Sequence, residues 1–275
     1  MSDHPAPLTL DHLTLADATP AQLATAAAAA DCTGICLFLQ AMDVLPVMPA
    51  FDLVTDHAAR RALKAQMADL GLRLELAYPF TLAGRTDIAA FAPALACAAE
   101  LEARRVNLLI YDREPDRAAA RFAAFCDLAD SFGLGVALEF YPASQVPSLA
   151  AAQAYIRAVN RPGRVGINVD LLHLMRSGGT LAELAAVPQA DVLFAQLADG
   201  PATRPQADWE SEAATDRRPA GDGDFDLAGF AAALPAGCPM SIEIPCAADL
   251  MSGLSHSQRA QKAVTGVRRA LAKAA

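Results

Sequence analysis

The stretch GVALEFYP, residues 135–142, decides the fold, because it reads as a strand that is buried on both of its faces. Side chains alternate along a strand, so Val136 and Leu138 lie on one face and Glu139 lies on the other. The aliphatic face suits packing against helices, as in a parallel sheet. We therefore expect Glu139 on the inner face, where burial of a carboxylate costs several kcal/mol unless the group finds a partner.

Strand-like segments of this kind recur along the whole chain and alternate with Ala-rich segments of helical periodicity. Strands that alternate regularly with helices predict a (β/α)₈ TIM barrel, and an open doubly wound sheet is the alternative. No glycine-rich turn follows the first segment, which disfavours the open sheet. The other predicted strands span residues 8–15, 34–40, 73–80, 105–112, 165–172, 191–199 and 239–245. The predicted helices span residues 20–31, 56–70, 86–103, 115–132, 148–160, 180–186, 226–234 and 255–273.

The composition narrows the class of protein. The chain has 275 residues, of which 54% are hydrophobic, so we expect a single TIM-barrel domain over residues 1–275. Its net charge of −9 argues against binding to nucleic acid or to anionic membranes. We find no apolar run of membrane-spanning length and no signal-peptide pattern at the start. The 6 cysteines form no Cys-x-x-Cys pair, so we expect reduced cysteines in a cytoplasmic protein.

Three further predicted strands carry a polar group near their carboxyl ends, as GVALEFYP carries Glu139. These groups are Asp170 in VGINVDLL, Gln196 in DVLFAQLAD and Glu243 in PMSIEIP. The four strands are consecutive, and barrel active sites form at the carboxyl ends of strands, so we expect the four side chains to converge. Without a cation between them, the three carboxylates would repel one another. Oxygen ligands of this kind favour a hard divalent ion such as Mg²⁺ or Mn²⁺.

Other candidate residues lie next to this predicted rim. His173 follows the sixth strand, and we expect it to contact substrate or to carry a proton. The long irregular segment 199–226 follows the seventh strand, and loops of that length in compact domains are usually functional. It contains Arg217 and Arg218, either of which is a candidate to bind substrate oxygens over the barrel mouth. Trp209 in the same segment is a candidate to line the pocket or to pack the loop.

The order of these motifs resembles the sugar phosphate isomerase/epimerase superfamily, whose members have xylose-isomerase-like TIM barrels. The motifs read LEFYP, NVDLLHLMRSGG, AQLADG, RRPAGDGDFDL and SIEIP in this chain. The resemblance implies one divalent metal ion, Mn²⁺ or Mg²⁺ with Co²⁺ or Zn²⁺ as alternatives. Its ligands are then Glu139, Asp170, Gln196 and Glu243. It further implies that His173 contacts substrate, as does Arg217 or Arg218.

The resemblance also implies the reaction. We expect a metal-dependent isomerase or epimerase of a small sugar or polyol-derived α-hydroxy ketone, in which Glu139 and Glu243 move a proton through an enediolate, with His173 as a further proton carrier. Many sugar epimerases carry His where this chain has Gln196, and Gln in that place is similar to 3-dehydroshikimate dehydratases. A dehydratase of that type is therefore an alternative, and a non-catalytic ligand-binding barrel is another. The expected partners are a small-molecule substrate and, by resemblance, further copies of the chain.

Overall fold

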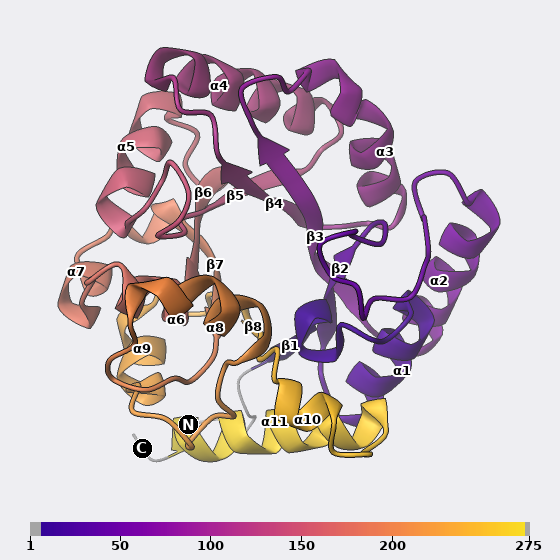
Figure 1. Ribbon diagram of the computed structural model, residues 1–275. Helices are drawn as coiled ribbons and strands as arrows, with labels where there is room; N and C mark the ends of the chain where they lie inside the picture. The colour runs from indigo at the N-terminus through magenta and orange to yellow at the C-terminus, as the bar shows by residue number, and fades with distance from the viewer. Residues whose placement is uncertain (1–6, 273–275) are drawn as a thin grey trace.

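The strands of this chain close into a barrel, as the computed structural model of residues 7–272 shows (Figure 1). Each of the eight strands pairs in parallel with the next along the chain. The last strand, β8, also pairs in parallel with β1, so that Thr9 lies opposite Ser241. This closing pair confirms the (β/α)₈ TIM barrel and excludes the open sheet. The strands are β1 Leu8–Asp11, β2 Gly34–Phe38, β3 Arg73–Leu82, β4 Arg105–Ile110, β5 Gly135–Glu139, β6 Val165–Asp170, β7 Val192–Leu197 and β8 Met240–Ile242.

The helices form a ring outside the barrel, and α11 packs against α1 to complete it (Figure 1). Each predicted helix is present, with its bounds shifted by a few residues at most, except that the segment 86–103 is divided into η2 and α3. The α-helices are α1 Pro20–Ala29, α2 His57–Asp69, α3 Ala92–Glu100, α4 Pro115–Ser131, α5 Leu149–Val159, α6 Leu171–Arg176, α7 Leu181–Ala185, α8 Trp209–Thr215, α9 Leu227–Ala233, α10 Ala247–Leu250 and α11 His256–Ala272. The 3₁₀ helices are η1 His12–Leu15, η2 Ile88–Phe91, η3 Gln189–Asp191 and η4 Gln206–Asp208.

The two faces of each strand contribute to two different clusters of buried side chains. Val136 and Leu138 of β5 belong to the large core between the strands and the helices. Ala137 faces the barrel interior, where it packs in a smaller cluster with Leu76 and Phe194. The alternation predicted for GVALEFYP is therefore confirmed. Glu139 is two positions after Ala137 and lies on the same inner face, where it lines the cavity at the strand ends.

The first strand is shorter than the predicted segment 8–15. β1 ends at Asp11, whose side chain accepts a hydrogen bond of 2.9 Å from the backbone N–H of Leu13. This local bond caps η1 and turns the chain away from the sheet. His12 is consequently not a strand residue but lies buried in η1, where its Nε2 is 2.9 Å from the backbone oxygen of Ala18.

The segment after β7, predicted as an irregular loop, contains η4 and the helix α8. The carboxylate of Asp199 organises the base of this segment by accepting backbone N–H groups from Gly200, Gly221, Gly223 and Phe225. Because these bonds bring both ends of the segment together, α8 is carried across the carboxyl ends of the strands (Figure 1).

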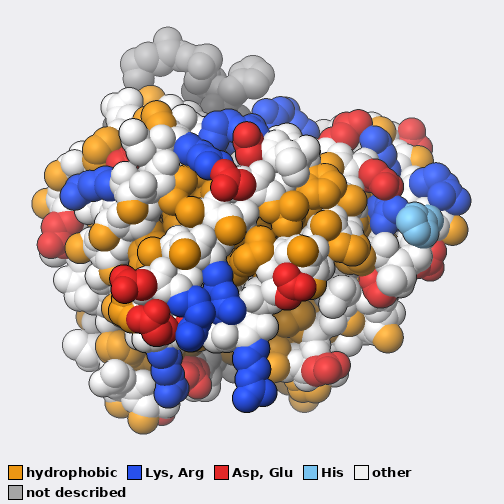
Figure 2. Space-filling model, turned by 90° about the horizontal axis from the view of Figure 1, so that it is seen from above, with side chains coloured by type: hydrophobic (Ala, Val, Ile, Leu, Met, Phe, Trp, Pro, Cys, Tyr) orange, Lys and Arg blue, Asp and Glu red, His pale blue; other side chains and the backbone are white. Residues whose placement is uncertain are grey.

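The outside of the molecule mixes side chains of both charges with neutral and hydrophobic ones on the face that Figure 2 presents. Between residues 7 and 272, no helix combines the length and the apolar character that a membrane span requires. The six cysteines are free in this structure, and four of them, Cys32, Cys36, Cys97 and Cys126, are buried.

Candidate functional site

A cavity of about 210 Å³ opens at the carboxyl ends of the strands, beneath α8. Five of the residues singled out in the sequence line it: Glu139, His173, Gln196, Arg217 and Glu243. They come from β5, α6, β7, the segment after α8 and the end of β8. The structure thus brings together side chains that are up to 104 residues apart in the sequence, since the strand ends meet at one rim.

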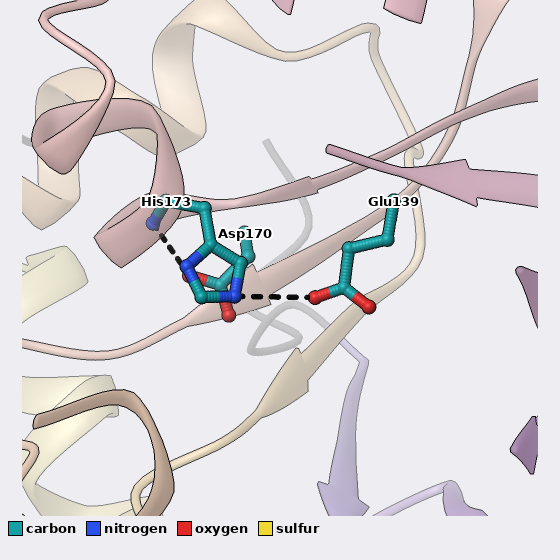
Figure 3. Close-up of side chains that lie close together, drawn as sticks. All are labelled: Glu139, Asp170 and His173. Carbon is teal, nitrogen blue, oxygen red and sulfur yellow. Dashed lines mark hydrogen bonds and ion pairs between the residues drawn. The ribbon is translucent and has the colours of Figure 1, made fainter. Parts of the chain in front are cut away.

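A cluster of two carboxylates and an imidazole lies at this rim, formed by Glu139, Asp170 and His173 (Figure 3). All three are buried, and one ligand atom from each lies within 4.8 Å of the others. The Nε2 of His173 is 3.5 Å from Oε1 of Glu139. These three side chains are arranged so that they can hold a metal ion.

The local sequence explains why His173 lies beside Asp170. Asp170 ends β6 and is also the N-cap residue of α6, so its Oδ1 accepts the backbone N–H of His173 at 3.0 Å. An N-cap carboxylate bonds the backbone of the first helical turn, which places the residue three positions later at the same strand end. The motif NVDLLH therefore forms a strand end and a helix start that both contribute to the cluster.

Arg217 lies between two of the predicted metal ligands. Its Nη1 donates to Oδ2 of Asp170 at 2.5 Å and its Nη2 donates to Oε1 of Glu243 at 2.8 Å. Its Nε donates to the backbone oxygen of Ala213 in α8 at 3.1 Å. The side chain is 2% exposed, so the guanidinium acts as a buried counter-charge for Asp170 and Glu243.

Arg218 is placed differently from Arg217. It is exposed, its Nη1 donates to the backbone oxygen of Asp222 at 3.1 Å, and it does not line the cavity. Trp209 does not line the cavity either; its Nε1 donates to the backbone oxygen of Arg204 at 3.1 Å, which is the loop-packing role.

Gln196 lies in a chain of buried amides that joins Glu139 to Glu243. Its Nε2 donates to Oε2 of Glu243, and its Oε1 accepts from Nδ2 of Asn168. Asn168 also donates to Oδ1 of Asn107 at 3.1 Å, and Nδ2 of Asn107 donates to Oε2 of Glu139 at 2.5 Å. Both glutamates therefore receive an amide donor from beneath the rim.

Asn107 and Asn168 were not singled out from the sequence. Asn168 is two residues before Asp170 in β6, so both side chains lie on the inner face of the strand. This alternation could have identified Asn168 from the sequence. Asn107 lies in the middle of β4, where the sequence shows a single amide within the apolar run VNLLI.

Asp11 is a further buried carboxyl group that the sequence did not reveal as part of the site. It accepts hydrogen bonds from the hydroxyl of Tyr78 and, at 3.4 Å, from Nε2 of Gln196. Burial raises the pKa of Asp11 to about 7, although the hydroxyl of Tyr78, the backbone N–H of Leu13 and the charge of Arg217 act in the opposite direction. The pKa of Tyr78 is raised well above its ordinary value, first by burial and then by the charge of Asp11.

Two of the predicted ligands, Glu243 and Asp170, have pKa values that are shifted in opposite directions. Burial raises the pKa of Glu243 well above its ordinary value, and Arg217 offsets only part of this effect. Burial acts in the same direction on Asp170, but Arg217 and His173 outweigh it and hold the pKa below the ordinary value. Burial alone would lower the pKa of the Arg217 guanidinium, but the carboxylates of Asp170 and Glu243 outweigh it and raise this pKa above its ordinary value.

The charge balance of the rim tests whether a metal ion fits. Four carboxyl groups, those of Asp11, Glu139, Asp170 and Glu243, are buried around the single guanidinium of Arg217. Buried charges of one sign need an equal opposite charge, and one guanidinium among four carboxyl groups leaves the rim short of positive charge. A divalent cation would supply the missing charge, and carboxylate, amide and imidazole donors are ligands that Mn²⁺, Co²⁺ and Zn²⁺ accept. The residues present fit such an ion.

Solved structures with the same fold include several barrels of known or suspected activity. The IolI protein with a bound zinc atom superimposes with a TM-score of 0.79 at 18% identity, covering 98% of this chain and 99% of that one. The probable 3-DHS dehydratase AsbF from Bacillus anthracis gives 0.73 at 12% identity, covering 97% and 98%. A D-allulose 3-epimerase from Methylomonas sp. gives 0.69 at 15% identity, covering 98% and 100%.

A longer protein matches over part of its length. It is a fusion of a xylose isomerase-like TIM barrel with a 4-hydroxyphenylpyruvate dioxygenase, with a TM-score of 0.78 at 20% identity. The match covers 96% of this chain and 42% of the fusion protein. Identities this low show a shared fold and do not transfer an activity.

Comparison of the sequence with curated proteins gives no match. The family model of the xylose isomerase-like TIM barrel, in contrast, matches residues 24–271, which is nearly the whole chain. This match agrees with the closed barrel and with the residues gathered at its mouth. The chain belongs to the xylose isomerase-like TIM barrel family.

Proposed function

We propose that this protein is a divalent-metal-dependent enzyme that removes a proton next to the carbonyl group of a small hydroxylated substrate, and thereby isomerises or epimerises it. The observation that carries the proposal is the buried cluster of Glu139, Asp170 and His173, of which Glu139 and His173 line the cavity. Buried carboxylates at the carboxyl ends of barrel strands are the arrangement expected for catalysis rather than for stability.

We propose Glu139, Asp170, Gln196 and Glu243 as the residues that hold the ion. Glu139 and Asp170 belong both to this set and to the cluster with His173, so their assignment has the strongest support. Glu243 lies on the far side of Arg217 from Asp170, and its oxygens face the same guanidinium and the amide of Gln196. When bound, a divalent ion polarises a carbonyl and stabilises negative charge on neighbouring substrate oxygens. Mn²⁺ and Mg²⁺ are the first candidates, followed by Co²⁺ and Zn²⁺.

We assign proton transfer at the substrate to two carboxylates. Glu139 has one oxygen held by Asn107 and the other 3.5 Å from Nε2 of His173. A proton that Oε1 of Glu139 takes from a substrate carbon can therefore pass to His173. Glu243 reaches the cavity from the other end of the amide chain, so it can return a proton from a different direction.

The direction of proton return decides the product. Return to the same carbon from the opposite side inverts its configuration, which is epimerisation. Return to the neighbouring carbon exchanges the carbonyl and hydroxyl groups, which is isomerisation. Arg217, with its guanidinium at the cavity wall, is the proposed contact for substrate oxygens, whereas the exposed Arg218 lies outside this cavity.

A dehydratase acting on a cyclic hydroxylated ketone is the second candidate, and two observations favour it. The ligand position that carries His in many sugar epimerases carries Gln196 here. One wall of the cavity is formed by apolar and aromatic side chains, among them Phe38, Tyr78, Phe80 and Leu109. Such a wall suits the face of a carbon ring better than an open-chain sugar, whose hydroxyl groups need polar partners.

A substrate panel tests the proposal. The protein would be loaded with Mn²⁺ and incubated separately with ketoses and with 3-dehydroshikimate. Formation of an epimer or an aldose, measured by NMR, supports the isomerase; an ultraviolet-absorbing aromatic product supports the dehydratase. Binding of a panel compound without any turnover would indicate a ligand-binding barrel and overturn the proposed activity.

A further inference from the structure

A second buried ion pair joins the helix that carries His173 to the helix above the cavity. Arg176, in α6, donates from Nε to Oε2 of Glu212 at 2.6 Å and from Nη2 to Oε1 of Glu212 at 2.7 Å. The side chains are 4% and 0% exposed. Nη2 of Arg176 also donates to the backbone oxygen of Pro201 at 2.9 Å, and the guanidinium lies 5.3 Å from the ring centroid of Phe225. We call Arg176 and Glu212 the clasp.

The clasp connects elements that all contribute to the site. On one side, Arg176 is one helical turn after His173 in α6, whose N-cap residue is Asp170. On the other side, Glu212 is next to Ala213 in α8, whose backbone oxygen holds Nε of Arg217. Arg217 in turn donates a hydrogen bond from its Nη1 to Oδ2 of Asp170. A closed ring of contacts therefore runs from the end of β6 through both helices and back.

The two sides of α8 have different roles. Glu210, Ala213 and Ala214 line the cavity, and they recur at the three- and four-residue spacing of one helix face. Glu212, between them in sequence, is turned toward α6 and is completely buried. The charge of Glu212 is therefore not available to substrate. Its contacts instead determine how close the cavity-lining face of α8 lies to the strand ends.

We propose that Arg176 and Glu212 are positioning residues that hold α8 over the cavity and thereby place Arg217 for substrate binding. Neither residue touches the cavity, so their effect is transmitted through α8 and Ala213. The role of Arg217 in this inference rests on the proposed function, whereas the docking of α8 by the clasp does not.

Removing one partner and removing both have different consequences for a buried pair. With Arg176→Met alone, the carboxylate of Glu212 would be buried without a counter-charge, so α8 should move away from the barrel to hydrate it. With Arg176→Met and Glu212→Leu together, no charge remains to be hydrated and the two side chains can pack on each other. The double variant should therefore keep α8 docked better than either single variant does.

Trp209 gives a direct readout of this docking. It is the first residue of α8 and the single tryptophan of the chain, so its fluorescence reports on that helix alone. We would measure quenching of Trp209 by acrylamide, together with KM and kcat for the substrate found in the panel above. We expect each single variant to increase the quenching constant about twofold and KM about tenfold, with a smaller change in kcat, because a weakened binding contact acts mainly on KM. The double variant should return both values to within about threefold of the wild type.

The matched control is an ion pair at the other end of the barrel, between the partly buried Arg105 and the buried Glu75. Arg105, at the start of β4, lies 3.2 Å from the carboxylate of Glu75 and has a side chain that is 15% exposed. Arg105→Met should lower the midpoint of thermal unfolding but leave Trp209 quenching and KM at their wild-type values.

Two outcomes would overturn the proposal. One is wild-type quenching in both single clasp variants; the other is a double variant as strongly affected as the single ones. If the wild type turns over no substrate, the proposed function fails, while the quenching measurements still decide whether the clasp docks α8.

Discussion

Glu139 and Glu243 show how single residues of this chain combine burial with charge. Each carboxylate lies on the barrel rim, receives an amide hydrogen bond from below and faces a cationic or ionisable side chain. Such groups lower the stability of the folded chain unless their charge is balanced. A bound cation would balance it, so metal affinity is the property that single substitutions at the rim should change first.

Glu243→Gln should weaken metal binding, because it removes one anionic ligand and keeps the shape of the side chain. We expect at least a tenfold loss of Mn²⁺ affinity by isothermal titration calorimetry.

His173→Ala should retain the metal and lose turnover, since His173 is proposed as a proton carrier and not as a ligand.

Glu210→Gln is the matched control for Glu243→Gln, because it removes a glutamate charge from the same cavity at a position outside the proposed ligand set. It should leave metal affinity unchanged. Unchanged metal binding in Glu243→Gln, combined with metal loss in His173→Ala, would replace the proposed ligand set by Glu139, Asp170 and His173.

His12 should make the stability of the protein depend on pH. It is fully buried in η1 against Phe51, and burial lowers its pKa from 6.5 to about 4. The unfolded chain then binds the proton more readily, so the contribution to stability is complete above pH 6.5 and is lost as the pH falls through 4. The full loss is about 3 kcal/mol. In His12→Phe, the free energy of unfolding measured with urea should fall less between pH 7 and pH 4.5; parallel curves for both proteins would contradict this.

At the scale of elements, the inward-facing positions of β5 and β6 were predictable, whereas the last residue of a strand and the connections between elements were not. The alternation of polar and apolar residues in β5 and β6 identified Glu139 and Asp170, because strand periodicity is local and encoded in adjacent residues. The end of β1 depended on a side-chain bond from Asp11 to the backbone, which an apolar pattern does not show. The contact of Arg176 with Glu212 joins residues 36 positions apart, and no spacing rule predicts it.

Asp199 should be essential for the order of the segment 199–226. Its carboxylate accepts four backbone N–H groups, and Asp199→Asn replaces one acceptor oxygen by a donor. We expect a loss of about 3 kcal/mol in the free energy of unfolding and faster hydrogen exchange of the amides in α8.

The control for this loop is Asp226→Asn, at the N-cap of α9. That carboxylate accepts a single helical N–H, from Gly229 at 2.8 Å. It should cost less than about 1 kcal/mol, since asparagine is also a good N-cap residue. Equal exchange rates for α8 in both variants would show that Asp199 does not organise the segment.

At the scale of the whole molecule, the closed barrel is what turns scattered polar residues into one site. Parallel strands place all their carboxyl ends at the same rim, so β5 to β8 bring Glu139, Asp170, Gln196 and Glu243 together although they are far apart in the sequence. The fold does not specify the reaction, because barrels of this family differ in chemistry while sharing their architecture. The chemistry must therefore be tested at the substrate carbon itself.

Exchange of the substrate C–H proton with deuterated water tests metal-dependent proton removal most directly. In D₂O with Mn²⁺, the wild type should introduce deuterium next to the carbonyl of at least one ketose or of 3-dehydroshikimate, as followed by NMR. Removal of the metal with EDTA or the substitution Glu139→Gln should slow this exchange by about 100-fold or more. Absence of deuterium from every compound tested, or equal exchange with and without metal, would contradict the proposed function.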